Sequence, residues 1–241
     1  MLLVDADLYL FRCLAATEEE TDWGDDVWSL TSDLKLAKEL FIDQLDNFRD
    51  ELGVKRVLLC ISSKENFRRG VDPTYKAARK KTRKPLGYVA MVDWAKDIFD
   101  TFQKDGLEAD DCMGILATKP ENKGKSIIVS DDKDMMSIPS KLYRPSSNER
   151  MDISEQEADR FFYYQTLIGD ATDGYGGLKG VGPKTADKIL GNRPAWSLVE
   201  QAYTKAGFTS EDAIQQARLA RILRWEDWDA DKEQVKLWSP K

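Results

Sequence analysis

The sequence predicts an α/β protein whose mostly parallel sheet is covered by helices on both faces. Three short apolar runs, residues 2–4, 57–61 and 127–129, are typical of buried strands, and each is followed at once by polar residues. Between them, apolar residues recur at spacings of three and four over residues 34–52 and 88–102, which predicts amphipathic helices. Strands that alternate with helices favour a parallel sheet, in which ligands bind beyond the carboxyl ends of the strands.

After about residue 150 the strand signals fade and the pattern becomes helical. Helices are predicted over residues 155–168, 183–190 and 210–225. The acidic stretch at residues 17–26 is interpreted as a solvated loop. We expect the tryptophans near the end of the chain to pack onto the core rather than to stack on bases: Trp225, Trp228 and Trp238.

Composition sets limits on the kind of protein and its chemistry. The 241 residues are 41% hydrophobic and 33% charged, and no apolar run approaches the roughly 18 residues of a membrane span. We therefore expect a globular, cytoplasmic monomer with no membrane partner. The chain has no histidine, which excludes His-based triads, His-ligated zinc and imidazole bases. Cys13, Cys60 and Cys112 are expected to be reduced core thiols.

Basic charge is concentrated in one segment of an acidic chain. The whole chain carries −7, whereas residues 68–84 carry +7, with Asp72 as their single acid. Such a stretch can bind phosphates, although a merely solvated basic helix is the alternative. The basic residues are Arg68, Arg69, Lys76, Arg79, Lys80, Lys81, Arg83 and Lys84.

Acidic residues stand at the ends of four predicted elements. They are Asp5, Glu108, Asp110, Asp111, Asp132, Asp134, Asp170 and Asp173. One such group is usually a helix cap or a solvated end. If all four converge, however, their mutual repulsion requires cations, and carboxylate oxygens suit Mg²⁺ or Mn²⁺. Two ions about 4 Å apart stabilise both the attacking and the leaving oxygen of a phosphodiester.

A glycine-rich stretch, residues 176–185, precedes the predicted helix at 183–190. It is not a P-loop, because Pro183 stands where the lysine is required. Pro183 suits the first position of a helix, and the glycines before it let backbone N–H groups approach a DNA phosphate. The alternative is a plain turn between helices. The residues expected at the phosphate are Gly180, Gly182, Lys184 and Thr185.

Several motifs together resemble the flap endonuclease-like 5′ nucleases. Besides the strand-borne Asp5, they are Glu108-Ala109-Asp110-Asp111, Ser130-Asp131-Asp132-Lys133-Asp134, Gly169-Asp170-Ala171-Thr172-Asp173-Gly174, Gly180-Val181-Gly182-Pro183-Lys184-Thr185-Ala186, and Asp72-Pro73-Thr74-Tyr75-Lys76-Ala77-Ala78-Arg79. The likeness is greatest to the short 5′→3′ exonucleases of tailed bacteriophages and covers nearly the whole chain. It implies a PIN-like nuclease core over residues 1–152, with a helical arch at about 64–90. It also implies a helical region over 153–241 that contains a helix-three-turn-helix DNA-binding motif at about 167–190.

The resemblance further implies two Mg²⁺ sites, at which Mn²⁺ is expected to substitute. Matched by position to the family motif, Asp5, Glu108, Asp110 and Asp111 would coordinate the first ion directly or through water. Asp132 lies between the sites, and the second is completed by Asp134, Asp170 and Asp173. A monovalent cation such as K⁺ is permitted at main-chain carbonyls of the glycine-rich stretch near Val181.

The implied substrate is DNA with a free 5′ end, as duplex or 5′ flap, and RNA in RNA–DNA hybrids is possible. Tyr75 would stack on a base, while Lys76 and Arg79 would contact the scissile phosphate and stabilise its developing charge. Asp5, Lys76, Arg79 and Asp132 are the expected catalytic residues. Such an enzyme would serve phage DNA replication or host DNA degradation, in the host cytoplasm if phage-encoded.

One position departs from the family pattern, and two alternative functions stay open. After the second strand the family presents an acid, whereas this chain has Ser62-Ser63, so the first site would bind its ion more weakly or through water. Asp5-Ala6-Asp7 could instead be the nucleophile motif of a haloacid dehalogenase-type phosphatase. The other alternative is a non-catalytic DNA-binding member of the family.

Overall fold

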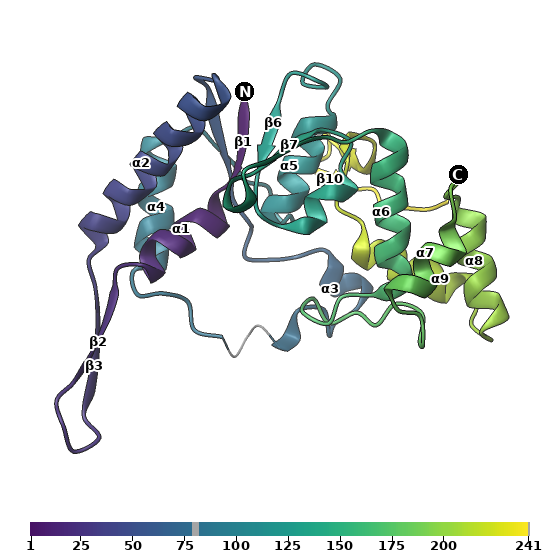
Figure 1. The fold of residues 1–241 in the computed structure, drawn as a ribbon, viewed down its shortest axis with the longest axis horizontal. Coiled ribbons are helices and arrows are strands. Elements are labelled where there is room, and N and C mark those ends of the chain that lie inside the picture. Colours follow the sequence, from purple (N-terminus) through teal and green to yellow (C-terminus); the bar gives the residue numbers. More distant parts are fainter. Residues whose placement is uncertain (79–81, 241) are drawn as a thin grey trace.

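The computed structural model describes residues 1–78 and 82–240, and its main sheet is mostly parallel. Within these residues the six strands run in the order β5-β4-β1-β6-β7-β8. Every neighbouring pair is parallel except β7 with β8. The strands are β1 (Leu2–Asp5), β4 (Val57–Cys60), β5 (Thr101–Phe102), β6 (Ile127–Val129), β7 (Lys141–Arg144) and β8 (Glu149–Asp152). The predicted sheet is confirmed (Figure 1), although β5, β7 and β8 lie outside the three predicted strands.

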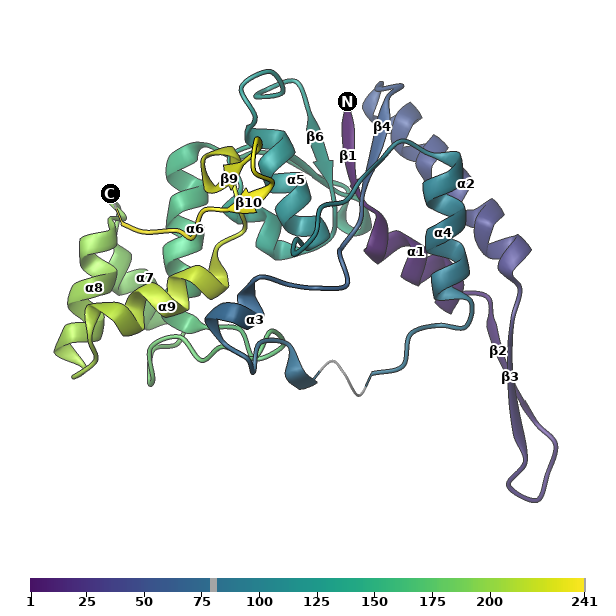
Figure 2. The ribbon, with the colours of Figure 1, turned by 180° about the vertical axis from the view of Figure 1, so that it is seen from behind.

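Helices cover both faces of this sheet, as predicted. Alternate residues of β1 point to opposite sides, so Leu2 and Val4 join one core and Leu3 the other. The first core packs against α1 (Ala6–Ala15), α2 (Leu34–Leu52) and α4 (Tyr88–Ile98). The second packs against α5 (Ala109–Thr118) and the C-terminal residues (Figures 1 and 2). The two apolar layers hold the carboxyl ends of the strands in place.

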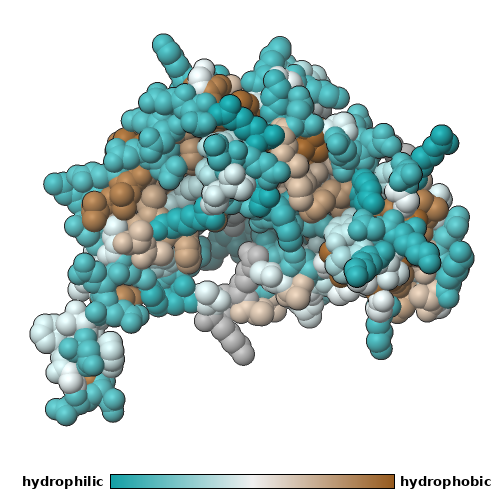
Figure 3. Space-filling view, in the orientation of Figure 1, coloured by the Kyte–Doolittle hydropathy of each residue, from teal (hydrophilic) through white to brown (hydrophobic). Residues whose placement is uncertain are grey.

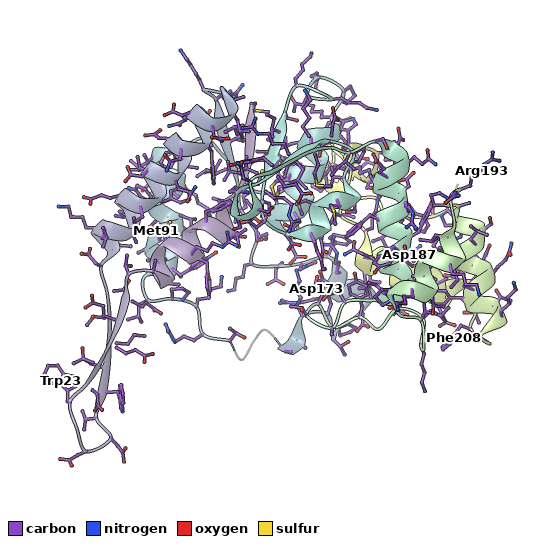
Figure 4. The ribbon with its side chains drawn as sticks, in the orientation of Figure 1. Trp23, Met91, Asp173, Asp187, Arg193 and Phe208 are labelled. Atoms are coloured by element: carbon purple, nitrogen blue, oxygen red, sulfur yellow. The ribbon has the colours of Figure 1, made fainter. Side chains whose placement is uncertain are left out.

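Two local predictions in the first half of the chain are wrong. The helix predicted over residues 88–102 ends at Ile98, because Phe102 pairs with Cys60 in strand β5. The acidic stretch at residues 17–26 is not a plain loop. It forms the first strand and the turn of an antiparallel hairpin, β2 (Glu18–Asp22) and β3 (Trp28–Ser32). This hairpin projects from the body, with Trp23 69% exposed near its tip (Figure 4).

The second half of the chain is helical, as predicted, apart from short strands. Its helices are α6 (Glu155–Ile168), α7 (Pro183–Leu190), α8 (Trp196–Lys205) and α9 (Ser210–Ala220). A capping box between Ser154 and Glu157 starts α6. The helix predicted over residues 210–225 ends at Ala220, and η4 (Trp225–Asp227), β9 (Trp228–Asp229) and β10 (Gln234–Val235) follow. The boundary between residues 152 and 153 stays a prediction.

The early end of α9 lets the next residues pass directly beneath α5. A Cβ atom on Gly114 would lie 2.3 Å from the carbonyl oxygen of Leu223, so only glycine permits this approach. Trp228 is buried in the second core, and the Trp238 ring packs on Phe162 and Trp196. The predicted packing of the chain end is confirmed. All three cysteines are buried and free, as predicted.

The segment predicted to form a helical arch, residues 64–90, connects β4 with α4. In the described parts of residues 64–90, α3 (Arg68–Val71) is the single α-helix before α4 begins at Tyr88.

No helix in the described ranges is both long and apolar enough to cross a bilayer.

Candidate active site

Asp5 anchors a group of carboxylates at the carboxyl edge of the sheet. One of its oxygens accepts the Ser130 hydroxyl at 2.8 Å, and the other accepts the Leu8 N–H at 3.2 Å. Asp5 thereby caps α1 and is fixed to the end of β6. The region below this edge is hydrophilic and hollowed between α1 and α3 (Figure 3).

The predicted acids come close enough to affect one another's ionisation. Burial and the neighbouring carboxylate of Asp7 raise the pKa of Asp5 to about 7. Burial, Asp5 and Asp132 raise the pKa of Asp110 well above its usual value. Burial and Asp132 also raise the pKa of Asp134. Mutual repulsion of this kind is what a bound cation relieves.

Asp7 lies close to Asp5, and the sequence analysis named it only in the phosphatase alternative. Its carboxylate accepts the Ser62 backbone N–H at 2.9 Å and the Tyr88 hydroxyl at 3.0 Å. It therefore brings a negative charge from α1 to the end of β4, where the sequence has serine. Ser63 itself accepts only a local hydrogen bond from the Glu65 N–H, and the Ser62 hydroxyl accepts the N–H of Ala109 at the start of α5.

Lys76 lies among the acids, as predicted for a residue near the chemistry. Its ammonium is 2.5 Å from Glu108 and 3.5 Å from Asp173. Its backbone has φ 54° and donates to the Asp173 carbonyl, so the main chain also holds it there. Burial raises the pKa of Glu108, but Lys76 and Arg68 outweigh that effect and lower it to about 2. Asp173, on the loop after α6, faces this cluster beside α3 (Figure 4).

Tyr75 is placed differently from its predicted role. The ring is 3% exposed, and its hydroxyl donates to Glu108 at 3.1 Å or to Asp173 at 2.9 Å. In this conformation the ring is packed against Phe162 and Tyr175 and is not available for stacking on a base. Tyr75 instead supports the two carboxylates that face Lys76.

Arg68 and Asp111 form a buried ion pair, which corrects their predicted roles. The guanidinium donates two 2.8 Å hydrogen bonds to Asp111, and the two side chains are 2% and 0% exposed. Arg68 also donates to the carbonyls of Leu219 and Arg221. In this conformation the guanidinium is not available to a DNA phosphate. Asp111 also accepts the Leu223 N–H, so its carboxylate is engaged in contacts that hold the fold together.

The remaining basic residues lie nearer the surface. Arg83 is exposed and is held by Glu18 of the β2–β3 hairpin through 2.7 and 2.8 Å hydrogen bonds. The ammonium of Lys84 lies over the Tyr88 ring, and Arg69 is half-buried. Arg79, Lys80 and Lys81 lie outside the described residues.

The glycines between α6 and the start of α7 serve two purposes. Gly169 and Gly177 pack backbone to backbone, since a Cβ on Gly177 would lie 2.3 Å from the Gly169 nitrogen. Gly180 and Gly182 face open space, and Gly182 precedes Pro183 at the start of α7. Lys184 and Thr185 are exposed beside them. This exposed helix start, unlike the packed glycines, is available for a phosphate.

The acids do not form a closed metal-binding group in this conformation. No three acidic or thiol side chains within residues 1–78 and 82–240 are placed to hold one ion. Lysine ammonium groups stand between them instead: Lys76 between Glu108 and Asp173, and Lys133 between Asp134 and Asp170. A divalent ion would have to replace these contacts.

The raised carboxylate pKa values predict an unusual pH dependence of stability. Asp5, with a pKa of about 7, holds a proton in the folded chain between pH 4 and 7 that it loses on unfolding. The folded state then binds more protons, so stability falls as pH rises through this range. In EDTA, the Tm is expected to be about 5–10 °C lower at pH 8 than at pH 5. Asp5→Asn should reduce this difference, and a Tm that instead rises toward pH 8 would contradict the assignment.

Comparison with known families decides what kind of site this is. Residues 1–161 match the model of the 5′-3′ exonuclease, N-terminal resolvase-like domain. The chain belongs to the 5′-3′ exonuclease family.

Individual relatives agree with this membership. The exonuclease of Escherichia phage T7 is 28% identical over 281 aligned positions, which cover 100% of this exonuclease and 93% of the phage protein. The exodeoxyribonuclease of Enterobacteria phage T3 is 28% identical with the same coverage. The T5 D15 protein co-crystallised with metal ions has a TM-score of 0.67 at 15% identity, covering 91% of this chain and 88% of that one. The T5 D15 flap endonuclease in a complex with DNA and metal ions gives 0.66 at 14%.

Three predictions are thereby confirmed: the family, the PIN-like α/β fold, and the nuclease class of the enzyme. The phosphatase alternative loses its basis, because Asp5 and Asp7 belong to a nuclease fold. The roles of single site residues stay predictions.

Proposed function

We propose that this 5′-3′ exonuclease hydrolyses DNA from free 5′ ends and cleaves 5′ flaps with the help of divalent cations. The observation that carries the proposal is the approach of carboxylates from four elements to one another at this edge, where Lys76 lies between Glu108 and Asp173 and the pKa values of Asp5 and Asp110 are raised. Such a pocket suits hard cations and a phosphodiester. The T5 relative solved with both DNA and metal ions supports the same reading.

The donor chemistry fits Mg²⁺ or Mn²⁺. The acids at the edge offer carboxylate oxygens and no thiolate or imidazole, which is the set that these ions prefer. We assign one ion to Asp5, Glu108, Asp110 and Asp132, with Asp7 close by. We assign the other to Asp134, Asp170 and Asp173, and we leave Asp111 out because Arg68 occupies both its oxygens. When bound, these ions activate water and stabilise charge on phosphate oxygens.

The protein's own side chains position the substrate. Lys76 lies between Glu108 and Asp173, and we propose that it turns from Glu108 to the scissile phosphate. Arg79 would assist it. The N–H groups at the start of α7, with Lys184 and Thr185, would hold a phosphate further along the duplex without reading bases. K⁺ at the carbonyls near Val181 would strengthen that grip.

Cleavage of end-labelled DNA tests this function. Duplex and 5′-flap substrates carrying a 5′ label are incubated with Mg²⁺, Mn²⁺ or EDTA. We expect short labelled products with either metal ion and none in EDTA. The same duplexes labelled at the 3′ end should instead shorten progressively, which reports the 5′→3′ direction. DNA binding without cleavage in both metals would contradict the proposal and favour a non-catalytic member of the family.

A further inference from the structure

Lys133 stands at the centre of the second group of acids and has no role in the function proposed so far. Its ammonium lies 2.7 Å from Asp134 and 3.1 Å from Asp170. Asp134 belongs to η2 (Lys133–Ser137) at the edge of the core, whereas Asp170 follows α6 in the helical region. One ammonium thus joins carboxylates from two parts of the chain.

The charges around Lys133 explain why it is held there. Both carboxylates lie within hydrogen-bond distance of the one ammonium, so they also stand close to each other. Two carboxylates so close together repel each other. The ammonium therefore provides the positive charge that this pair of acids needs when no metal ion is bound.

Lys133 can leave this position more easily than Lys76 can. The side chain of Lys133 is 57% exposed, compared with 12% for Lys76. It extends from an exposed residue on a flexible four-carbon stem. The same oxygen of Asp134 also accepts the Gln165 amide at 2.6 Å, so it is already occupied from two sides. An incoming cation at this oxygen must displace the ammonium.

We propose that Lys133 is a tethered counter-ion that occupies the second cation position and competes with the divalent ion for Asp134 and Asp170. The proposal rests on the divalent-ion dependence proposed above. Two consequences follow from it. Lys133 stabilises the metal-free protein, and it weakens binding of the second ion, because every binding event must first break its two ion pairs.

The test compares Lys133→Met with the wild type in direct Mn²⁺ titrations, read by the EPR signal of free Mn²⁺. Methionine keeps the length of the stem and removes the charge. We expect the weaker Mn²⁺ site of Lys133→Met to bind about three- to fivefold more tightly, which is the range for a half-exposed ion pair. The Tm in EDTA should fall, and the gain in Tm on adding Mn²⁺ should grow.

Two further variants make the result specific. Lys133→Arg keeps the charge and should restore the wild-type affinity. Lys141→Met removes an exposed lysine at the far end of β7 and should change neither quantity. Unchanged or weaker Mn²⁺ binding by a folded Lys133→Met, with two sites present in the wild type, would overturn the counter-ion role alone. A wild type that binds no Mn²⁺ would overturn the proposed metal dependence together with it.

Discussion

Replacing Asp132 by asparagine is expected to reduce DNA cleavage by more than about 100-fold while leaving the fold intact. Asp132 is exposed at the start of η2, and its charge contributes to the raised pKa values of both Asp110 and Asp134. Its position therefore suits an acid that acts on both of the proposed cation sites. Asparagine keeps the oxygen that accepts the Asp134 N–H at 2.8 Å, so the local turn should survive.

The measurement is single-turnover cleavage of a 5′-flap substrate, with DNA binding measured separately. Asp131→Asn is the matched control. It makes the same change at the adjacent residue, whose carboxylate pairs with Arg12 and Ser146 instead. Cleavage should persist in the control. Near-normal cleavage by Asp132→Asn would remove Asp132 from the metal site.

Replacing Arg68 by methionine is expected to lower the free energy of unfolding by about 3–5 kcal/mol. The change leaves the Asp111 carboxyl group without its ion-pair partner at a position with 0% exposure, and it removes the donors to the carbonyls of Leu219 and Arg221. The hydrogen bonds of Arg68 join α3, α5 and the end of α9. The loss should therefore loosen the contact between the core and the helical region.

Urea unfolding of Arg68→Met measures this effect, with the half-buried neighbour Arg69→Met as the control. DNA binding then separates the structural role from the role predicted by charge. A phosphate contact would lower the slope of log K against log salt by about one, whereas a buried structural residue leaves that slope unchanged. A stable Arg68→Met with a reduced salt slope would restore the original prediction.

Periodicity in the sequence was a good guide to the interior of the fold. The strands at 2–4, 57–61 and 127–129 are apolar on both faces, and the apolar residues of helix α2 recur every three to four positions. The spacing of apolar residues therefore indicates directly which residues are buried. The hairpin β2–β3 could not be found in this way. Its residues are mostly exposed, and its strands are paired with each other and not with a core.

The candidate site was predicted by position along the chain, and its errors have a common cause. Asp5, Glu108, Asp110, Asp132 and Asp173 were chosen because each follows or precedes a recognisable element, and their roles as metal ligands stay predictions. Arg68 was counted with its basic neighbours, since net charge does not reveal that one guanidinium turns inward to Asp111. Asp7 and Lys133 were not among the predicted site residues for the same reason: their partners lie up to 81 residues away in the sequence.

The β2–β3 hairpin restricts the direction from which DNA can reach the site. No lysine or arginine occurs between Arg12 and Lys35, so every charged residue of the hairpin is acidic. It stands at the end of the molecule opposite α7 (Figure 1), and its Glu18 holds Arg83 and the Leu86 N–H. The acidic residues of the hairpin repel phosphates that approach from that end, whereas no such repulsion is expected at the α7 end. We therefore expect the duplex body to approach from the α7 side, with only its 5′ end passing toward the hairpin.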